Sequence, residues 1–545
     1  MLDKSVVSPI LVGRVDDLAS LDQLLEQAAR GAGRVALIAA EAGLGKSRLV
    51  TEAVRRAEQR GVQVFRGYCF ETDRAFPYAP LIDLLRNHCE ARSTSEIART
   101  FQSTAPELVR IFPELKTNFP HLKPAPAIDP ERDKRRLFAA LEQFLSAQFS
   151  PVAIVVIEDL HWADETSLEF LLYLARHSRQ TPLLLLLTYR SDEVHPPLEH
   201  FLAELDRSRL ATELRLTPLA KSETDTMLRA IFELSRPVRS EFLDVLYPLT
   251  EGNPFFIEEI LKSLIIAGDI FYADGNWDRK PIKELNVPRT IRDAVQRRAH
   301  GLSAVARELL SLAAVAGQRF DFSLLKDLAG RGEDELLARL KELIAAQLIV
   351  EESAERFAFR HALTREAIYS QLLAREQIAL HKRIAEALEC SEEQEIENIA
   401  HHFYQAQVWP KAMEYAQRAG ERALALYAPR AALVHYSHAL ESGKRLGKLP
   451  PAGLLRARGE AYETVGDFEH ALADLGAALE ISRSEQDHRA LWQASIKLGK
   501  LWASRDYART GDYFQQALEL ARGINDPTLL AHSLNRIGNW HSNLD

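Results

Sequence analysis

The chain has 545 residues, which are too many for one hydrophobic core, so we expect three or more domains. Its residues are 46% hydrophobic and 27% charged, a composition typical of a globular protein. Its formal net charge of −9 argues against a general attraction to nucleic acid or to an anionic membrane. The three cysteines have no paired spacing, which excludes a disulfide scaffold and a cysteine-rich metal site.

The first 220 residues alternate short apolar runs with helical patterns. Near-continuous apolar strands are typical of a parallel sheet covered on both faces, so we predict an α/β domain over residues 1–220. The expected strands are 34–40, 62–69, 152–157, 183–189 and 211–216, and the expected helices are 45–60, 165–178 and 198–208. Residues 79–150 are expected to be mostly helical, with a proline-rich loop.

A phosphate-binding loop follows the first expected strand. The segment Gly43-Leu-Gly-Lys-Ser47 stands between a strand and a helix, which is the context that a P-loop NTPase core requires. Its backbone N–H groups can surround an oxyanion, while Lys46 can reach the β- and γ-phosphates and the Ser47 hydroxyl can bind Mg²⁺. We expect the nucleotide to contact Glu41, Ala42, Gly43, Leu44, Gly45, Lys46, Ser47 and Arg48. The alternative is an ordinary strand-to-helix turn.

One position departs from the P-loop pattern. Ala40 stands where the pattern has its first glycine. Alanine lacks the freedom of glycine at positive φ, so we expect the chain at Ala40 to use an ordinary backbone conformation.

Two acids end the third expected strand. Glu158 and Asp159 follow six apolar residues. Neighbours on a strand point in opposite directions, so we predict that Glu158 holds Mg²⁺ while Asp159 orients or deprotonates a water molecule. The alternative is that both acids begin a solvated loop.

Arg190 follows the fourth expected strand. At the tip of a strand beside the site, it could sense the γ-phosphate. It could equally pair with Glu193 at the surface, and the sequence favours neither role.

The rest of the chain is predominantly helical. We predict a helical lid domain over 221–300 and a winged-helix-like domain over 301–390, with short strands at 348–350 and 356–359. Residues 391–545 are expected to form tetratricopeptide-like repeats, because 452–485 carries small and large residues at most marker positions of the 34-residue pattern. The last unit stops after one helix, so we expect the natural protein to continue beyond residue 545.

Several short motifs occur in a characteristic order. They are Leu11-Val-Gly-Arg14, the P-loop, Glu158-Asp-Leu-His-Trp-Ala-Asp164, Thr188-Tyr-Arg190 and Gly252-Asn-Pro-Phe255. Together they resemble the STAND class of signal-transduction ATPases, specifically the AAA-type ATPase domain of large LuxR-type bacterial regulators.

The resemblance implies further nucleotide contacts. Val12 and Gly13 would contact adenine and Arg14 the phosphates, while Pro254 would lie near the adenine or ribose and His361 near the β-phosphate of ADP. Other interpretations stay open: Arg14 pairing with Asp16 or Asp17, a plain helix-breaking turn at Pro254, and a structural His361. We expect Asp164 to cap a helix and Trp162 to serve packing.

The function that we predict is an ATP/ADP-dependent switch of signal transduction, a slow ATPase that uses Mg²⁺. It would be the ATPase and sensor part of a transcriptional regulator, with an inducer bound at the repeats and self-association on activation. DNA would be contacted only through a region beyond this chain. The alternatives are a nucleotide-stabilised interaction scaffold and a module that regulates a partner enzyme. Without a signal peptide or an apolar run long enough to cross a bilayer, we expect a cytoplasmic protein and no membrane partner.

Overall fold

The computed structural model describes residues 6–90, 92–126, 129–149, 151–273, 276–285, 287–288, 290–391 and 395–543. The chain divides into two compact units. Unit 1 comprises Met1–Arg74 and Tyr78–Ala387, and unit 2 comprises Ala75–Pro77 and Leu388–Asp545.

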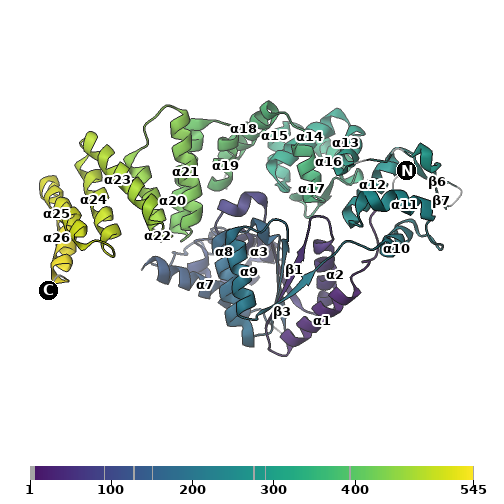
Figure 1. Ribbon diagram of the computed structural model, residues 1–545, viewed down its shortest axis with the longest axis horizontal. Coiled ribbons are helices and arrows are strands. Elements are labelled where there is room, and N and C mark those ends of the chain that lie inside the picture. The colour runs from purple at the N-terminus through teal and green to yellow at the C-terminus, as the bar shows by residue number, and fades with distance from the viewer. Residues whose placement is uncertain are drawn as a thin grey trace. The chain divides into compact units, whose positions relative to one another are not determined.

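Unit 1 is built around a parallel sheet of five strands in the order β2-β3-β4-β1-β5 (Figure 1). All five predicted strands are confirmed within one or two residues, as is the α/β fold class. The strands are β1 (Arg34–Ala40), β2 (Gln63–Tyr68), β3 (Ala153–Glu158), β4 (Leu183–Arg190) and β5 (Ala211–Arg215). Because β4 pairs in parallel with both β1 and β3, the carboxyl ends of these three strands lie at one edge.

Helices cover both faces of this sheet. One face packs its alternate residues, such as Ala36, Ile154 and Leu186, against apolar side chains of α1 and α2. Helices α8 and α9 lie on the other side (Figure 1). The helices of the α/β core are α1 (Val15–Ala29), α2 (Lys46–Gln59), α3 (Ala79–Glu90), α4 (Thr94–Phe101), α5 (Ala105–Leu108), α6 (Leu115–Asn118), α7 (Pro130–Ser146), α8 (Glu165–His177) and α9 (Pro196–Arg207). Burial on both faces explains why the strands are apolar throughout.

The segment after the core is helical, as predicted, with one exception. Its helices are α10 (Lys221–Phe232), α11 (Ser240–Thr250), α12 (Pro254–Ile266) and α13 (Ile291–His300). The purely helical prediction for 221–300 is wrong at an antiparallel hairpin, β6 (Ile270–Ala273) and β7 (Asn276–Arg279). Three of the four residues of β7 are polar, so no apolar run in the sequence reveals the hairpin.

A small three-stranded antiparallel sheet with the order β8-β10-β9 follows. The strands predicted at 348–350 and 356–359 are confirmed as β9 (Ile349–Glu351) and β10 (Arg356–Phe359), and β8 (Arg319–Asp321) is an addition. We call residues 304–359 the small-sheet segment. Helices in and after it are α14 (Ala304–Ala316), α15 (Phe322–Ala329), α16 (Glu333–Ala345), α17 (Ala362–Tyr369) and α18 (Ala374–Cys390).

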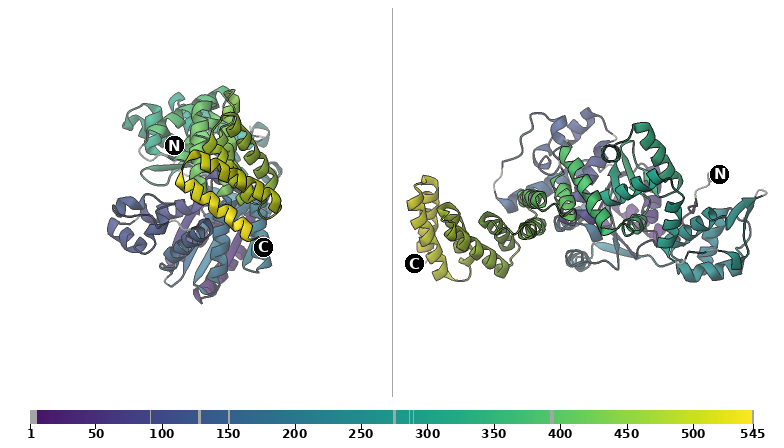
Figure 2. Two further views of the ribbon diagram at one scale, coloured as in Figure 1. Left: turned by 90° about the vertical axis from the view of Figure 1, so that its left-hand side faces the viewer. Right: turned by 90° about the horizontal axis from the view of Figure 1, so that it is seen from above.

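The described part of unit 2 is helical, and its successive helices lie side by side (Figure 2). They are α19 (Ile396–Gln405), α20 (Trp409–Ala425), α21 (Pro429–Arg445), α22 (Ala452–Thr464), α23 (Phe468–Ser484), α24 (His488–Trp502), α25 (Tyr507–Ile524) and α26 (Pro527–Ser542). The predicted repeat of 452–485 is confirmed as the pair α22 and α23.

The repeat packing depends on glycine placed against a large side chain. A Cβ added to Gly459 would lie 2.8 Å from Leu475 Cγ, and one added to Gly499 would lie 2.5 Å from Phe514 Cδ1. Each glycine lets a neighbouring helix approach closely, which is why small and large residues recur at fixed spacing.

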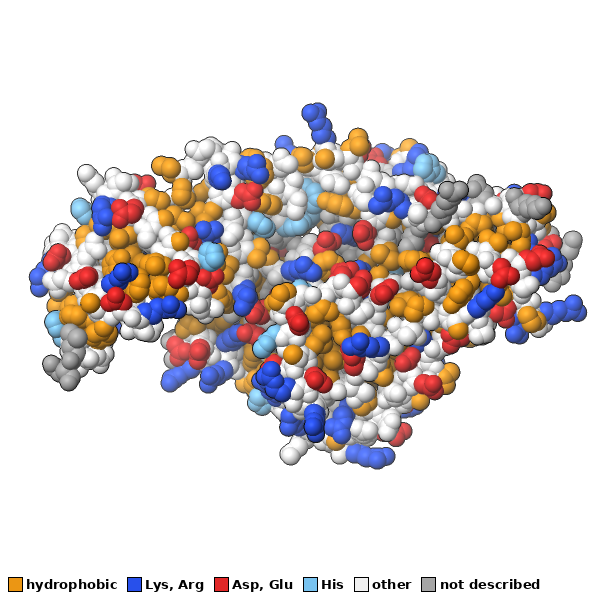
Figure 3. Space-filling view, in the orientation of Figure 1, with side chains coloured by type: hydrophobic (Ala, Val, Ile, Leu, Met, Phe, Trp, Pro, Cys, Tyr) orange, Lys and Arg blue, Asp and Glu red, His pale blue; other side chains and the backbone are white. Residues whose placement is uncertain are grey.

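The surface carries both signs of charge. Acidic and basic side chains are interspersed over the face shown in Figure 3. Among the helices that the structure describes, none combines the length and the apolar character needed to cross a membrane.

Candidate functional site

The predicted P-loop connects β1 to α2. Ala40 is the last residue of β1 and is buried, so an alanine is accommodated there as part of the strand. Gly43 and Gly45 have φ values of 83° and 96°, which side chains rarely adopt. A Cβ at Gly45 would meet no heavy atom within 4 Å, so the space beside the start of α2 is open.

Lys46 is folded back against this loop. Its Nζ donates to the carbonyl oxygens of Ala40 and Glu41 at 2.9 and 3.1 Å, and the residue is only 7% exposed. Burial lowers the pKa of the Lys46 ammonium, and the negative charge of Asp159 opposes that shift. The ammonium therefore lies where phosphate oxygens could replace two weakly charged carbonyl partners.

Glu158 and Ser47 come together at the other side of the loop. Glu158 ends β3, is 3% exposed and accepts a hydrogen bond from the Ser47 side chain. Burial raises the pKa of Glu158 to about 7, although the Ser47 hydrogen bond acts against this rise. A hydroxyl and a carboxylate are the oxygen donors that Mg²⁺ takes beside a nucleotide, so these two residues fit the metal. Within the described residues, no group of three histidines, cysteines or acids could hold an ion by itself.

Asp159 lies just after β3, in a turn of the backbone. The strand ends at Glu158, and Asp159 has a left-handed φ of 63°. Its N–H donates to Thr188 Oγ1 at 2.9 Å, which ties the turn to β4. Aspartate tolerates this conformation better than most residues. The separate roles expected for the two carboxylates stay predictions.

Arg190 belongs to the site and also pairs with Glu193. It ends β4, opposite Ala40 of β1, and its side chain is 12% exposed. Its Nη1 donates to Glu193 Oε1. Its charge also contributes to lowering the pKa of Lys46. The pairing with Glu193 is present, but it lies beside the P-loop rather than on the open surface.

His161 lies among these charges, and the sequence assigned it no role. The ring is 0% exposed, with Nδ1 3.9 Å from Asp159 Oδ1 and Nε2 3.9 Å from Glu193 Oε2. The N–H of Arg190 donates to Nδ1 at 3.4 Å. Burial and the neighbouring cations lower the pKa of His161 to about 2, so the ring is neutral.

Arg14 supports the loop through its backbone carbonyls. Its guanidinium donates to the carbonyl oxygens of Gly13, Leu44 and Thr217, at 3.2, 3.3 and 2.6 Å. Val12 packs against the apolar cluster of α10 to α12. Residues 12–14, which were expected to contact adenine and the phosphates, thus lie between the P-loop and the helices after β5.

The helical segment contacts the P-loop directly. Asn253 Nδ2 donates to the carbonyl oxygen of Ala42 at 2.9 Å, and the N–H of Phe255 donates to that of Gly43 at 3.3 Å. Asn253 also caps α12, with Pro254 as its first residue, so the helix-breaking turn and the contact with the loop are one structure. The sequence showed the turn, but nothing in it revealed which carbonyl Asn253 meets.

His361 reaches this junction from the segment that precedes α17. Its ring centroid lies 4.1 Å from that of Phe255, and burial lowers the pKa of His361 to about 4.

Arg48 points elsewhere in unit 1, since its guanidinium donates to the carbonyl oxygen of Ser8. Glu41 is exposed and Leu44 is buried.

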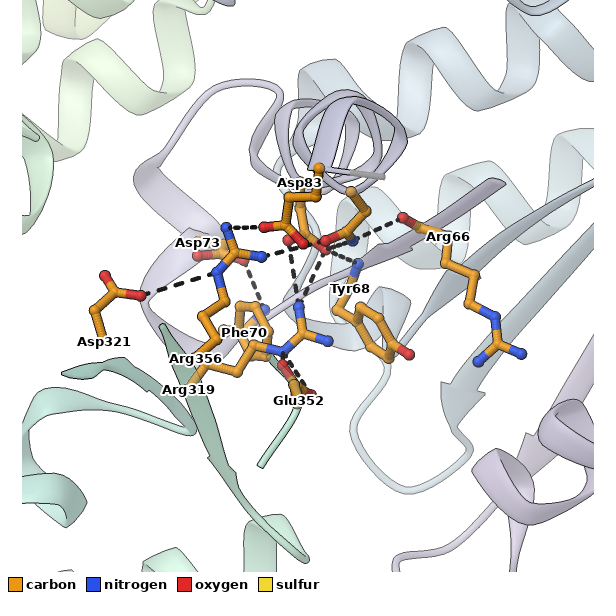
Figure 4. A network of polar contacts seen from close by, with 11 residues as sticks. Arg66, Tyr68, Phe70, Asp73, Asp83, Arg319, Asp321, Glu352 and Arg356 are labelled. Atoms are coloured by element: carbon orange, nitrogen blue, oxygen red, sulfur yellow. Dashed lines mark hydrogen bonds and ion pairs between the residues drawn. The ribbon is translucent and has the colours of Figure 1, made fainter. Parts of the chain in front are cut away.

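A second polar junction joins the small-sheet segment to the core (Figure 4). Arg319 of β8 is 3.3 Å from Asp83 Oδ1 and 2.8 Å from Glu352 Oε2. Its guanidinium also lies 4.0 Å above the ring centroid of Tyr68. Tyr68 pairs with Glu158 in the sheet, so this junction is anchored one strand away from the candidate metal ligand.

The comparisons with known proteins identify the first part of this chain. Residues 10–186 match the AAA ATPase domain family. The prediction of an AAA-type P-loop domain followed by helical repeats is therefore confirmed, by the family match and by helices α19 to α26.

Two curated proteins are similar over part of their length. An uncharacterized protein of Rhizobium meliloti is 27% identical over 400 residues, which cover 69% of this chain and 37% of that protein. The peroxide stress-activated histidine kinase mak3 of Schizosaccharomyces pombe is 26% identical over 245 residues, covering 42% of this chain and 10% of the kinase. The chain thus spans well under half the length of these relatives.

One solved structure aligns along the whole chain. It is a STAND protein with a tetratricopeptide repeat sensor from Pyrococcus horikoshii, with 16% identity and a TM-score of 0.42 over 100% of this chain and 76% of that one.

Proposed function

Because residues 10–186 match the AAA ATPase domain, we propose that this protein is an ATP/ADP-dependent molecular switch of signal transduction. The observation that carries the proposal is the contact of Asn253 and Phe255 with the carbonyls of Ala42 and Gly43. Because this helical segment is hydrogen-bonded to the phosphate-binding loop, its position depends on the phosphates that the loop binds.

The site residues take distinct roles in this proposal. Bound Mg·ATP supplies the phosphoryl group that is transferred to water. Lys46 binds the phosphates, and Ser47 with Glu158 holds the ion. Asp159 orients or deprotonates the attacking water, and Arg190 contacts the γ-phosphate after leaving Glu193. Slow hydrolysis resets the switch.

The helical segments after the core change their arrangement with the nucleotide that is bound. ADP would be enclosed by the core, the α10–α13 segment and His361, and exchange for ATP would favour an open form. The two nucleotides need to differ in their affinity for the two forms by only a few kcal/mol, about 1–3 in typical coupled systems.

The biological setting is a further part of the proposal. An inducer, either a small molecule or a protein, binds the helical repeats of unit 2, and the open form associates with its own copies. The protein then acts as the ATPase and sensor part of a transcriptional regulator, with DNA contacted only by a region outside residues 1–545.

Nucleotide content tests the proposal. Purified full chain is denatured and its released nucleotide is identified by chromatography, with Lys46→Ala as the test variant and Lys116→Ala, on the exposed side of α6, as the matched control. We expect stoichiometric ADP in the wild type and the control, and none in Lys46→Ala. No nucleotide in the wild type, with no binding of added Mg·ATP, would contradict the proposal. Retained signalling by Lys46→Ala would instead favour an interaction scaffold or a module that regulates a partner enzyme.

A further inference from the structure

The His161 ring is enclosed between two carboxylates of the candidate site. It is 0% exposed, and it lies between the carboxylates of Asp159 and Glu193. The backbone carbonyl of His161 also accepts a hydrogen bond from Arg74, whose guanidinium lies 4.6 Å above the ring centroid of Trp162. The histidine is therefore held in place from both its backbone and its surroundings.

The hydrogen bonds of the ring determine its tautomer. Nδ1 accepts from the N–H of Arg190, so in a neutral ring the proton is on Nε2. Nε2 is buried and has no hydrogen-bond partner within the described part of the chain. A buried donor without an acceptor costs free energy. An arrangement of the site that brings an acceptor to Nε2 would therefore be favoured.

Glu193 is the acceptor within reach. Its Oε2 lies 3.9 Å from His161 Nε2, while its Oε1 accepts from the guanidinium of Arg190. A side-chain rotation that moves the carboxylate by about 1 Å brings it to hydrogen-bond distance from Nε2. Glu193 thus has two possible partners, Arg190 and His161.

We propose that His161 is a positioning residue that receives the Glu193 carboxylate when Arg190 turns to a γ-phosphate. This inference rests on the proposed function. Without such a partner, the released carboxylate would compete with the phosphate for Arg190. A neutral N–H donor stabilises it without adding a second positive charge, so Arg190 leaves at a lower cost. ADP lacks the γ-phosphate and leaves the Arg190–Glu193 pair intact, so the exchange favours ATP specifically.

Two substitutions separate the donor from the acceptor of the ring. His161→Gln places an amide nitrogen near the position of Nε2, whereas the shorter side chain of His161→Asn keeps an oxygen near the position of Nδ1 and no donor at the position of Nε2. Both replace the ring with a smaller polar side chain, so a purely structural role would affect both alike. His177 of α8, an exposed residue, provides the matched control as His177→Asn.

The readout is the affinity of the full chain for Mg·ATPγS and Mg·ADP by isothermal titration calorimetry. We expect His161→Asn to weaken ATPγS binding by about tenfold, the usual effect of one hydrogen bond to a charged group, and ADP binding by less than about twofold. His161→Gln should recover most of the ATPγS affinity, and His177→Asn should match the wild type. Equal losses for both nucleotides, or for both His161 variants, would overturn the inference.

Glu193→Gln completes a double-mutant cycle. With the carboxylate removed, Arg190 is released without a competitor, so adding His161→Asn should change ATPγS affinity by less than about twofold. The same loss in both backgrounds would contradict the inference. A wild type that binds neither nucleotide would instead contradict the proposed function.

Crystal structures of the wild type keep the inference testable even if the variants fold poorly. With Mg·ATPγS, a carboxylate oxygen of Glu193 should lie within hydrogen-bond distance of His161 Nε2. With Mg·ADP, Glu193 should remain paired with Arg190. The Arg190–Glu193 pair unchanged in both complexes would overturn the proposal.

Discussion

The junctions within unit 1 and those within unit 2 differ in sequence separation and in their balance of polar and apolar contacts. Unit 1 joins segments far apart in sequence through polar contacts, such as Asn253 with Ala42 and Arg319 with Asp83. Unit 2 joins neighbouring helices, and there glycine lies against a large apolar side chain, as Gly499 does with Phe514, beside ion pairs such as Arg458 with Asp474. Polar groups can exchange one partner for another, whereas an apolar contact of this kind exists in one geometry. We therefore expect nucleotide-dependent change within unit 1, and a stiffer response within each repeat pair.

The buried ion cluster of Glu259 gives the largest expected effect. Its side chain is 2% exposed and pairs with Lys262 at 3.1 Å and with Arg298. Glu259→Gln leaves these cations without their shared carboxylate, so we expect the free energy of unfolding of unit 1 to fall by about 3–5 kcal/mol in urea titrations. Glu480→Gln, which removes one exposed partner of Arg483, is the control and should change little. A loss below about 1 kcal/mol in Glu259→Gln would show that the junction does not depend on its charges.

Two aspartates that cap helices are expected to respond oppositely to pH. Burial raises the pKa of Asp164, the cap of α8, to about 6, whereas hydrogen bonds from His470 lower the pKa of Asp467, the cap of α23. The folded protein thus protonates Asp164 more readily than the unfolded chain does. The free energy of unfolding of the wild type, measured relative to that of Asp164→Asn, should therefore rise by about 3 kcal/mol as pH falls from about 6 to below 4.

Asp467 should show the reverse dependence. Its stabilisation is present at neutral pH and is lost as pH falls through its lowered folded-state pKa. Thermal melts of Asp164→Asn, Asp467→Asn and the wild type from about pH 2 to 7 measure both dependences. Parallel pH profiles for the two variants would contradict this contrast.

Two glycines of unit 2 test its apolar junctions with the smallest expected effects. Gly499→Ala brings a Cβ to 2.5 Å from Phe514, so we expect a loss of about 1–3 kcal/mol from overpacking. Gly476 lies inside α23 with no atom within 4 Å of an added Cβ, so Gly476→Ala should stabilise the helix by up to about 1 kcal/mol. Circular dichroism melts of the full chain provide the comparison. If both variants destabilise equally, close packing at Gly499 is not what joins the helices.

The sequence was sufficient for most of the fold. Long apolar strands and the repeating small and large residues of 452–485 are signals that packing imposes locally, and both were confirmed. The hairpin of β6 and β7 and the strand β8 were missed, because β7 and β8 are mostly polar, unlike the apolar patches that revealed β9 and β10. The domain boundaries within unit 1 stay predictions.

The site was predictable where its residues stand in short motifs at the ends of parallel strands. The P-loop and the acids Glu158 and Asp159 meet because β1 and β3 both run parallel to β4, so their carboxyl ends lie at one edge of the sheet. The contact of Asn253 with Ala42 and the place of His161 between Asp159 and Glu193 were not predictable, because they depend on how segments tens to hundreds of residues apart pack together. The nucleotide contacts of Val12, Arg14, Arg48, Pro254 and His361 also stay predictions.

The central claim is that the lid contact at the P-loop depends on the phosphates bound there. Hydrogen–deuterium exchange of the full chain, followed at residues 41–47 and 253–257 in Mg·ADP and in Mg·ATPγS, measures this most directly. We expect residues 253–257 to exchange faster with Mg·ATPγS than with Mg·ADP, while 41–47 is protected by both nucleotides. Equal protection of 253–257 in the two complexes, with both nucleotides bound, would contradict the account.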